Sequence, residues 1–360
     1  TFATNNVTLN PNGNKIEGAT TNGNLATNDQ THTLVYTDTT QGWKIVNQDT
    51  ASSIQPTYTA ATGGTVTESG DYKIHTFTGD ADFIVSSIGN PLGGPNTSDY
   101  VVVAGGGGGG GRHGGAGGAG GYRESKCNTG TWTASPLATP TGIALTAQTY
   151  PVTVGSGGAG GNRAPSSTGA NGGNSVFSAI TSTGGGRGHT YATTAAQAGG
   201  SGGGGGHAQC SWSAGGAGNT PPVSPSQGNP GGNSQPGPYD WQGAGGGGAT
   251  ASGGGSPTIG GGDGGAGATS SINGTPTARA GGGGGGRYAC SPGGPGTGGA
   301  GGGGAGGGGP SASPVTATAG TANTGGGGGG YGGTNPGNPS PNCQGGTGGS
   351  GVVIIRYKFQ

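Results

Sequence analysis

The residues of this sequence best suited to recognition are aromatic and basic side chains that interrupt long glycine tracts. An aromatic ring offers a flat apolar face, and Tyr and Trp add a polar edge, so such residues suit contact with sugar rings or protein loops. Arginine and histidine add hydrogen-bond donors. We therefore predict a binding surface, unless these side chains only cap the exposed end of the scaffold. The candidates are Tyr122, Trp132, His207, Trp212, Tyr239, Trp241, Arg287, Tyr288 and Tyr331.

Catalytic patterns are poorly supported. Gly199–Gly203 (GGSGG) fits G-x-S-x-G, but a nucleophile elbow needs a strand, a sharp turn and a helix, and we expect no α-helix here. Ser201 is therefore expected to belong to the scaffold. A phosphate loop needs lysine after glycine, and none of the five lysines follows one. We predict that the protein is not an enzyme and uses no cofactor.

Three histidines flank glycine tracts, namely His113, His189 and His207. These three histidines lie far from one another in the sequence, unlike the closely spaced His pairs of zinc sites. We therefore predict a structural or recognition role for these histidines and no metal site.

The four cysteines each follow a glycine tract, and they are Cys127, Cys210, Cys290 and Cys343. If these tracts end on the same side of the molecule, the cysteines gather there. Cys210 and Cys290 each stand four residues after a tract, which favours pairing them and leaves Cys127 with Cys343. Four free thiols in a reducing compartment are the alternative.

The glycine tracts show a period of three residues, as in Ala116 and Ala119, with glycine at most other places. Polyproline-II geometry has three residues per turn, so positions three apart share a face. Two glycine faces and one side-chain face suit an extended polyglycine-II helix on the outside of a bundle. The period returns at Ser156, Ala159 and Asn162; Asn171 and Asn174; Pro230, Asn233 and Pro236; Asp263 and Ala266; Thr297 and Ala300; Tyr331 and Thr334; and Thr347 and Ser350.

Tracts made of glycine alone are expected inside the bundle, where any side chain would prevent close approach. Their buried N–H and C=O groups would pair with neighbouring helices. These tracts are Gly105–Gly111, Gly202–Gly206, Gly281–Gly286 and Gly325–Gly330. Disorder is the alternative, because 101 of the 360 residues are glycine and 23 are proline. The period and the low charged content of 7% argue against it.

Composition also limits the partners. Twelve basic residues balance twelve acidic ones, so no net field attracts nucleic acid, and no stretch of about 20 apolar residues suits membrane insertion. Methionine is absent, and we expect either a processed product or the C-terminal part of a longer protein.

The remaining segments predict β-structure. Thr31–Tyr36 and Trp43–Val46 should form a hairpin within a β-rich segment, 1–62, for attachment or oligomerisation, as in a homotrimer. Residues 63–104 carry strand patterns that the terminal segment, 352–360, should complete as a small sheet. That sheet would clamp both ends of the bundle formed by residues 105–351. The fold class is thus mostly irregular and β.

Several motifs resemble the glycine-rich domain of tail-fibre and other receptor-binding proteins of tailed bacteriophages. They are DYKIHTFTG, DYVVVAGGGGGGG, YPVTVGSGGAG, NGGNSVF and GGSGVVIIRYKF, and the likeness covers residues 63–360. The segment LVYTDTTQGWKIVN is similar to a β-unit that often precedes that domain. The resemblance implies a polyglycine-II bundle whose variable loops bind a host surface receptor.

Three functions follow as expectations. The first is a phage fibre-tip adhesin, located extracellularly on the virion, that binds a host glycan or outer-membrane protein and other fibre proteins. The second is a structural virion fibre or capsid decoration. The third is an ice-binding protein, which would need a flat face of Ala and Thr, whereas the outward positions here also hold Asn, Asp, Pro and Tyr.

Overall fold

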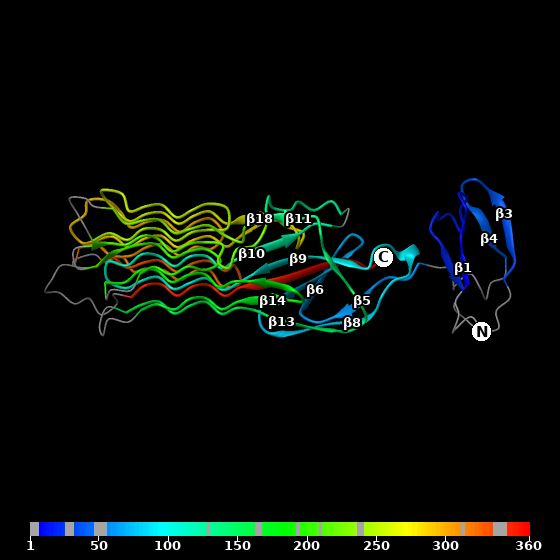
Figure 1. Cartoon of the computed structure of the whole chain (residues 1–360), viewed down its shortest axis with the longest axis horizontal. Helices are drawn as coiled ribbons and strands as arrows, with labels where there is room; N and C mark the ends of the chain where they lie inside the picture. The colour runs from blue at the N-terminus through cyan, green and yellow to red at the C-terminus, as the bar shows by residue number, and fades with distance from the viewer. Residues whose placement is uncertain are drawn as a thin grey trace.

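The molecule is elongated, with a small N-terminal unit at one end, a β-sandwich in the middle and a bundle of extended tracts at the other end (Figure 1). The computed structural model describes residues 7–25, 32–46, 56–127, 130–162, 168–191, 195–208, 211–235, 241–310, 314–333 and 344–360. Among these residues there is no α-helix, only the 3-10 turn η1 (Pro91–Gly93), and no helix has the length and hydrophobicity of a membrane span. The described residues therefore form the expected β and irregular fold.

The N-terminal unit consists of two antiparallel strand pairs. They are β1 (Val7–Leu9) with β2 (Gly23–Leu25), and β3 (Leu34–Asp38) with β4 (Gly42–Ile45). The turn between β3 and β4 is closed by Asp38, whose Oδ1 accepts the Thr40 N–H at 2.7 Å. In the described part of this unit, the buried core consists of Ile16, Leu25 and Ile45. The expected hairpin is confirmed.

The larger sheet of the sandwich joins the two ends of the glycine region. Its strand order is β11-β10-β9-β20-β7-β6, with β12 also paired to β9. β20 lies antiparallel between β9 and β7, with Val352 opposite Val103. This position confirms that the terminal segment completes the sheet. The strands are β6 (Thr65–Ser69), β7 (Tyr72–Phe77), β9 (Thr97–Val103), β10 (Tyr122–Ser125), β11 (Ala138–Thr139), β12 (Ile143–Ala144) and β20 (Val352–Lys358).

The second sheet has the order β15-β14-β13-β8-β5. Its strands are β5 (Ala60–Thr62), β8 (Ala81–Ser87), β13 (Thr149–Thr153), β14 (Ser175–Phe177) and β15 (Ile180–Ser182). The segments that return from the bundle supply β10 to β15. These strands are short, and their pairing within the two sheets stabilises them. The expected units 1–62, 63–104 and 105–351 therefore do not match the structural ones, because β5 and β10 to β15 all join the sandwich.

The space between the two sheets is filled mainly by aromatic rings. Phe83 is fully buried, and its ring centroid lies 5.0 Å from that of His75 and 6.0 Å from those of Phe177 and Tyr357. Alternate residues of β9 and β20 point to the other face of the larger sheet, where β18 (Ala268–Ser270) and β19 (Thr277–Arg279) form a covering hairpin. Burial of both faces explains the continuous apolar runs in β9 and β20.

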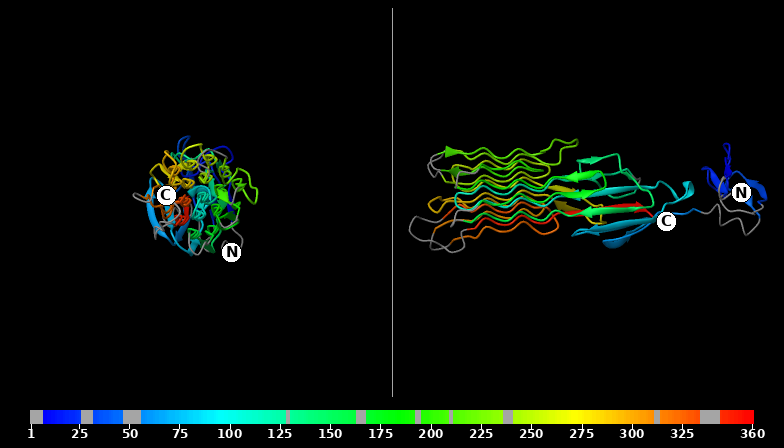
Figure 2. Two further views of the ribbon diagram at one scale, coloured as in Figure 1. Left: turned by 90° about the vertical axis from the view of Figure 1, so that its left-hand side faces the viewer. Right: turned by 60° about the horizontal axis from the view of Figure 1, so that its bottom comes forward.

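The tracts run side by side away from the sandwich (Figure 2), and their backbones bond in a period of three. In the first tract, the N–H groups of Gly105 and Gly108 donate to one neighbouring tract, at Gly173 and Ala170. The next two residues in each turn donate to two other tracts. Gly106 and Gly109 donate to Gly349 and Gly346, and Gly107 and Gly110 donate to Gly118 and Gly115. Three partners at successive thirds of a turn are what a three-fold extended helix requires.

The interior tracts have no room for side chains. A Cβ on Gly107 would lie 2.3 Å from the Gly186 carbonyl oxygen, and one on Gly108 would lie 1.9 Å from that of Ala159. All four tracts made of glycine alone are buried, as expected.

The outer tracts place every third residue at the surface, for example Ser156, Ala159 and Asp263. Ala116 and Ala119 are an exception to the expected outward placement, because both methyl groups are fully buried in the second tract. That tract is surrounded by others, and a methyl group fits where a larger side chain would not.

At the surface of the bundle, some backbone N–H groups have no neighbouring tract to bond to. Polar side chains that face outward accept hydrogen bonds from these groups instead. Asn171 Oδ1 accepts the Arg187 N–H at 2.9 Å. Asp263 Oδ1 accepts both the N–H and the hydroxyl of Thr297, at 2.7 and 2.8 Å. Side chains thus replace the missing tract at the surface.

Candidate functional site

The far end of the bundle, here called the tip, carries loops that join outgoing and returning tracts. The first such loop is only two residues long, because Arg112 and His113 both adopt left-handed backbone angles, with φ of 47° and 55°. This tight turn sends Gly114–Gly121 back toward the sandwich and leaves the His113 side chain at the tip.

His113 lies at the centre of an aromatic group. The centroid of its imidazole ring lies 5.2 Å from that of Trp241, 5.3 Å from that of Tyr191, 5.6 Å from that of Tyr288 and 6.5 Å from that of His207. Trp241 and Tyr288 also meet edge to face at 4.6 Å. We name these five residues with Trp212 the tip cluster.

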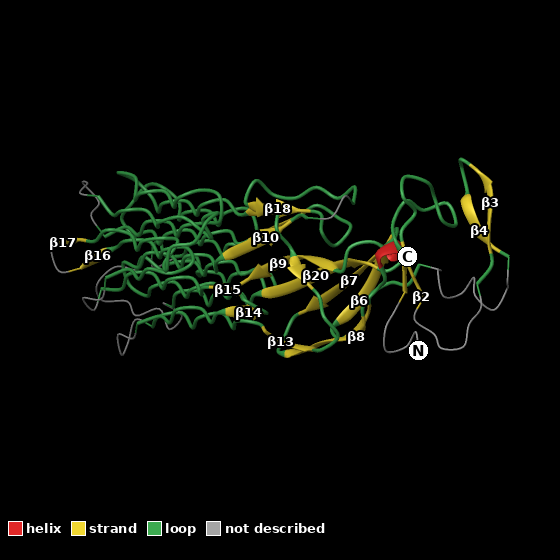
Figure 3. Cartoon of the chain, turned by 45° about the vertical axis from the view of Figure 1, so that its right-hand side comes forward, coloured by secondary structure: helices red, strands yellow, loops and turns green. Residues whose placement is uncertain are grey.

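The outer surface of the tip cluster is formed by two indoles. His207 and Trp212 stand opposite each other on the hairpin of β16 (His207–Ala208) and β17 (Ser211–Trp212), at the end of the bundle (Figure 3). The exposed fraction is 46% for Trp212 and 36% for Trp241, whereas His113, His207 and Tyr288 are buried beneath them. Buried rings thus hold two exposed indoles in place.

Arginines border this surface. The Arg112 guanidinium lies 4.0 Å from the centroid of the Tyr191 ring, which is a cation–π distance. Arg287 donates from Nε to the Ser291 carbonyl oxygen at 3.1 Å, within the loop that carries Tyr288. The described surface can therefore combine stacking with positive charge.

His189 lies below the tip cluster and is almost completely buried. Burial, with a smaller contribution from the charge of His207, lowers the pKa of His189 to about 4. Its Nδ1 has no hydrogen-bond partner among the described residues. His113, His189 and His207 thus come from three loops to one end, yet no group of three His, Cys, Asp or Glu in the described chain could hold a metal ion.

The family model described as "Glycine-rich domain" matches residues 86–358, most of the chain. The chain belongs to this glycine-rich domain family. A comparison with curated proteins finds no match. In this glycine-rich domain, the matched region contains every tract together with β9 and β20, the strands before the first tract and after the last one.

Two predicted site residues lie far from the tip. Tyr122 begins β10 and is buried, and its hydroxyl donates to Glu124 Oε2 at 3.1 Å. Trp132 has an exposed fraction of only 6% and packs in the cluster that includes Val101 and Ile354. The prediction that they belong to an exposed binding surface is wrong. The chain reverses at residues 112–113, so the tract that follows runs back to the sandwich and places Tyr122 and Trp132 there.

The other predicted residues divide into three groups. His207, Trp212, Trp241 and Tyr288 meet in the tip cluster, and Arg287 lies beside it. Tyr331 belongs to the tip end of a tract, but its side chain is buried. Tyr239 lies outside the described residues.

The cysteines do not all gather at one end. Cys127 lies against β9, with its Sγ 3.7 Å from Thr97 Oγ1, and burial with the nearby Asp99 raises the thiol pKa to about 11. Cys290 follows the tract Gly281–Gly286, in the loop of Tyr288 at the tip. The expected gathering is therefore wrong for Cys127. Cys210 and Cys343 lie outside the described residues, so both proposed pairs stay predictions.

Sequence reasoning missed Arg112 and Tyr191 and gave His113 no central place. A signal was present, since Arg112 and His113 are the only break between two glycine tracts. A two-residue break of this kind is long enough for a reversal of direction. Ser201, by contrast, lies in a tract as expected, fully buried, with its N–H bonded to the Ala119 carbonyl oxygen.

Proposed function

We propose that this glycine-rich domain is the adhesin of a bacteriophage tail fibre and binds a receptor on the host cell surface through its tip cluster. The observation that supports the proposal is the pair of exposed indoles, Trp212 and Trp241, at the end of a stiff bundle. Exposed aromatic residues on a rigid support commonly form the centre of a binding surface.

The scaffold suits this role for a physical reason. Each tract is bonded to several neighbours through its backbone, so the support depends little on the sequence of the loops. Loops can then change while the bundle keeps its shape. The receptor would be a surface glycan or an outer-membrane protein, because indole faces and arginine side chains can contact either.

The N-terminal unit would attach the adhesin to other fibre proteins on the virion, as a homotrimer. It lies at the opposite end from the tip (Figure 1), and Val7, Val35 and Val46 are exposed on it. Sedimentation of the purified protein tests this part, and a monomer at all concentrations would contradict the trimer.

The adhesin proposal is tested by replacing the exposed indoles in the purified full chain. We expect Trp212→Ala combined with Trp241→Ala to reduce binding to intact host cells at least tenfold, because two anchors of about 1 to 2 kcal/mol each are lost. Ile84→Ala is the control, since Ile84 is 43% exposed on β8, away from the tip. Equal binding by the double variant would contradict the proposal and favour a decoration protein.

A further inference from the structure

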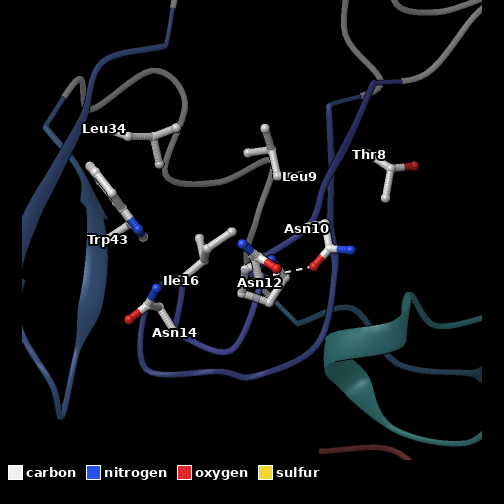
Figure 4. A pocket seen from close by; sticks show the side chains of 9 residues that line it. Thr8, Leu9, Asn10, Asn12, Asn14, Ile16, Leu34 and Trp43 are labelled. Carbon is white, nitrogen blue, oxygen red and sulfur yellow. Dashed lines mark hydrogen bonds between the residues drawn. The ribbon is translucent and has the colours of Figure 1, made fainter.

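We propose that the N-terminal unit holds a second binding site, for a neutral saccharide, in the cavity between residues 8–16 and the β3–β4 hairpin. The cavity measures about 440 Å³, and Figure 4 shows the side chains that line it. The N-terminal unit lies at the opposite end of the molecule from the tip (Figure 1). Pockets of about 300 to 1,000 Å³ are typical for small ligands, and this one has room for one or two sugar rings.

The cavity combines an aromatic wall with an apolar floor. Trp43 forms the wall, and its exposed fraction is 39% although the residue belongs to the centre of β4. Ile16 and Pro11 are buried at the base, and Figure 4 shows Ile16 and Trp43 facing the same space. An indole face of this kind can stack on the C–H groups of a pyranose ring.

The rim of the cavity is made of amides. Asn10, Asn12 and Asn14 all line it, and Asn10 and Asn12 are exposed. Asn10 Oδ1 accepts the backbone N–H of Asn12 at 2.8 Å, which fixes the loop. In the described part of the chain, no hydrogen bond engages the side-chain amide of Asn12 or Asn14. An amide both donates and accepts, as a sugar hydroxyl does, so these two groups are suited to neighbouring hydroxyls.

The absence of charge among the residues that line the cavity favours neutral saccharides over acidic ones. None of the residues that line this cavity is charged, whereas the neighbouring pocket includes Glu17 and Lys44. A carboxylate or phosphate in the cavity would lose hydration without gaining an ion pair, which is unfavourable. The lining therefore favours a neutral hexose or N-acetylhexosamine.

The site is preformed by backbone contacts. The Trp43 N–H donates to the Lys15 carbonyl oxygen at 2.7 Å, and the Trp43 carbonyl accepts from Glu17 at 2.9 Å. Gly42 permits this approach, since a Cβ there would lie 2.0 Å from the Lys15 oxygen and its φ is 74°. Tyr36 packs edge-on against the indole at 5.5 Å. The wall is thus held in place without a ligand.

The test is calorimetric titration of the purified full chain with neutral di- and trisaccharides of hexoses and N-acetylhexosamines, and with uronic-acid oligosaccharides. We expect saturable binding of at least one neutral saccharide and weaker binding of the acidic ones. Trp43→Ala should weaken binding about tenfold, and Asn14→Ala and Asn12→Gly, which tolerates the φ of 47° at residue 12, about threefold to tenfold each. Because the asparagine side chains make no hydrogen bond within the described chain, their variants keep the test valid even if Trp43→Ala misfolds.

Two control variants show whether binding occurs in this cavity. Val35→Ala changes the opposite face of the hairpin, since Val35 pairs with Lys44 while Tyr36 pairs with Trp43, and it should leave binding unchanged. Ile84→Ala on β8 should also leave it unchanged, and because the cavity variants keep both tip indoles, failure here is distinct from failure at the tip. No saturable binding of any neutral saccharide would overturn the proposal. So would sedimentation showing that Trp43→Ala dissociates an oligomer, because another chain would then occupy the cavity.

Discussion

The imidazole ring of His113 lies 5.2 Å from the indole ring of Trp241, and His113 Nδ1 lies 3.3 Å from the Trp241 carbonyl oxygen. One residue comes from the turn of the first tract pair and the other from the start of a much later tract. The earliest reversal of the bundle thus supports an exposed residue of the proposed recognition surface.

Removal of the His113 ring should loosen the tip without unfolding the bundle. Asparagine tolerates the left-handed backbone at this position, so His113→Asn removes the ring contacts with Trp241, Tyr191 and Tyr288 but keeps the turn. We expect a weaker near-ultraviolet circular dichroism signal and several-fold weaker cell binding. An unchanged spectrum would show that the other rings hold the indole without His113.

Glycine in the first tract should be irreplaceable. Gly107→Ala would place a methyl group 2.3 Å from the Gly186 carbonyl oxygen and force two tracts apart. We expect the free energy of unfolding to fall by about 3 kcal/mol or more, or the protein not to fold. Gly79→Ala is the matched control, because a Cβ there meets nothing within 4 Å. Chemical denaturation of both variants measures the difference, and equal stability would show that the tracts tolerate side chains.

The side-chain bonds at the bundle surface should contribute modestly to stability. Asp263→Ala removes the acceptor for both the N–H and the hydroxyl of Thr297, and we expect a loss of about 1 kcal/mol in the free energy of unfolding. Thr347→Ala also changes an exposed outward residue, but one whose side chain makes no hydrogen bond with the described residues. If both variants lose the same stability, the bonds to Thr297 contribute nothing specific.

Acid should destabilise the tip through His189. Its pKa is about 4 in the folded protein and near 6.5 when unfolded, so the unfolded chain binds more protons between these values. Above about pH 6.5, His189 is neutral in both states and does not lower the free energy of unfolding. As the pH falls from 6.5 toward 4, protonation of the unfolded chain lowers that free energy by about 3 kcal/mol in total. Thermal unfolding across this range should show a smaller loss for His189→Gln than for the original chain. Equal losses would assign the acid sensitivity to other groups.

The bundle and its clamp could be predicted from sequence because both depend on local patterns. Glycine runs specify tracts without side chains, and the apolar runs of residues 100–103 and 352–355 indicate strands buried on both faces. The rule that every third residue faces outward held for Ser156 and Asp263 but not for Ala116, because a methyl group is small enough for the interior.

The make-up of the tip was harder to predict because it depends on the direction of every tract. Composition does not show whether a tract runs toward the tip or back to the sandwich. Trp132 and Trp212 therefore look equivalent in sequence, although Trp132 lies at the sandwich end of the bundle and Trp212 at the tip. The ring of His113 contacts residues of several loops that are far apart in the sequence. A sequence pattern over a few residues cannot predict such contacts.

The pairing of Val103 with Val352 means that the chain leaves the sandwich and re-enters it at two neighbouring strands. The stretch between these two strands also supplies β10 to β15 of the sandwich, whereas, among the described residues, the hairpin of β16 and β17 and the other tip loops contribute no strand to it. Exchange of the gene segment for a tip loop can therefore alter the proposed recognition surface without removing a strand of the sandwich. Under the proposed function, such exchange would change host range while leaving the base of the fibre untouched.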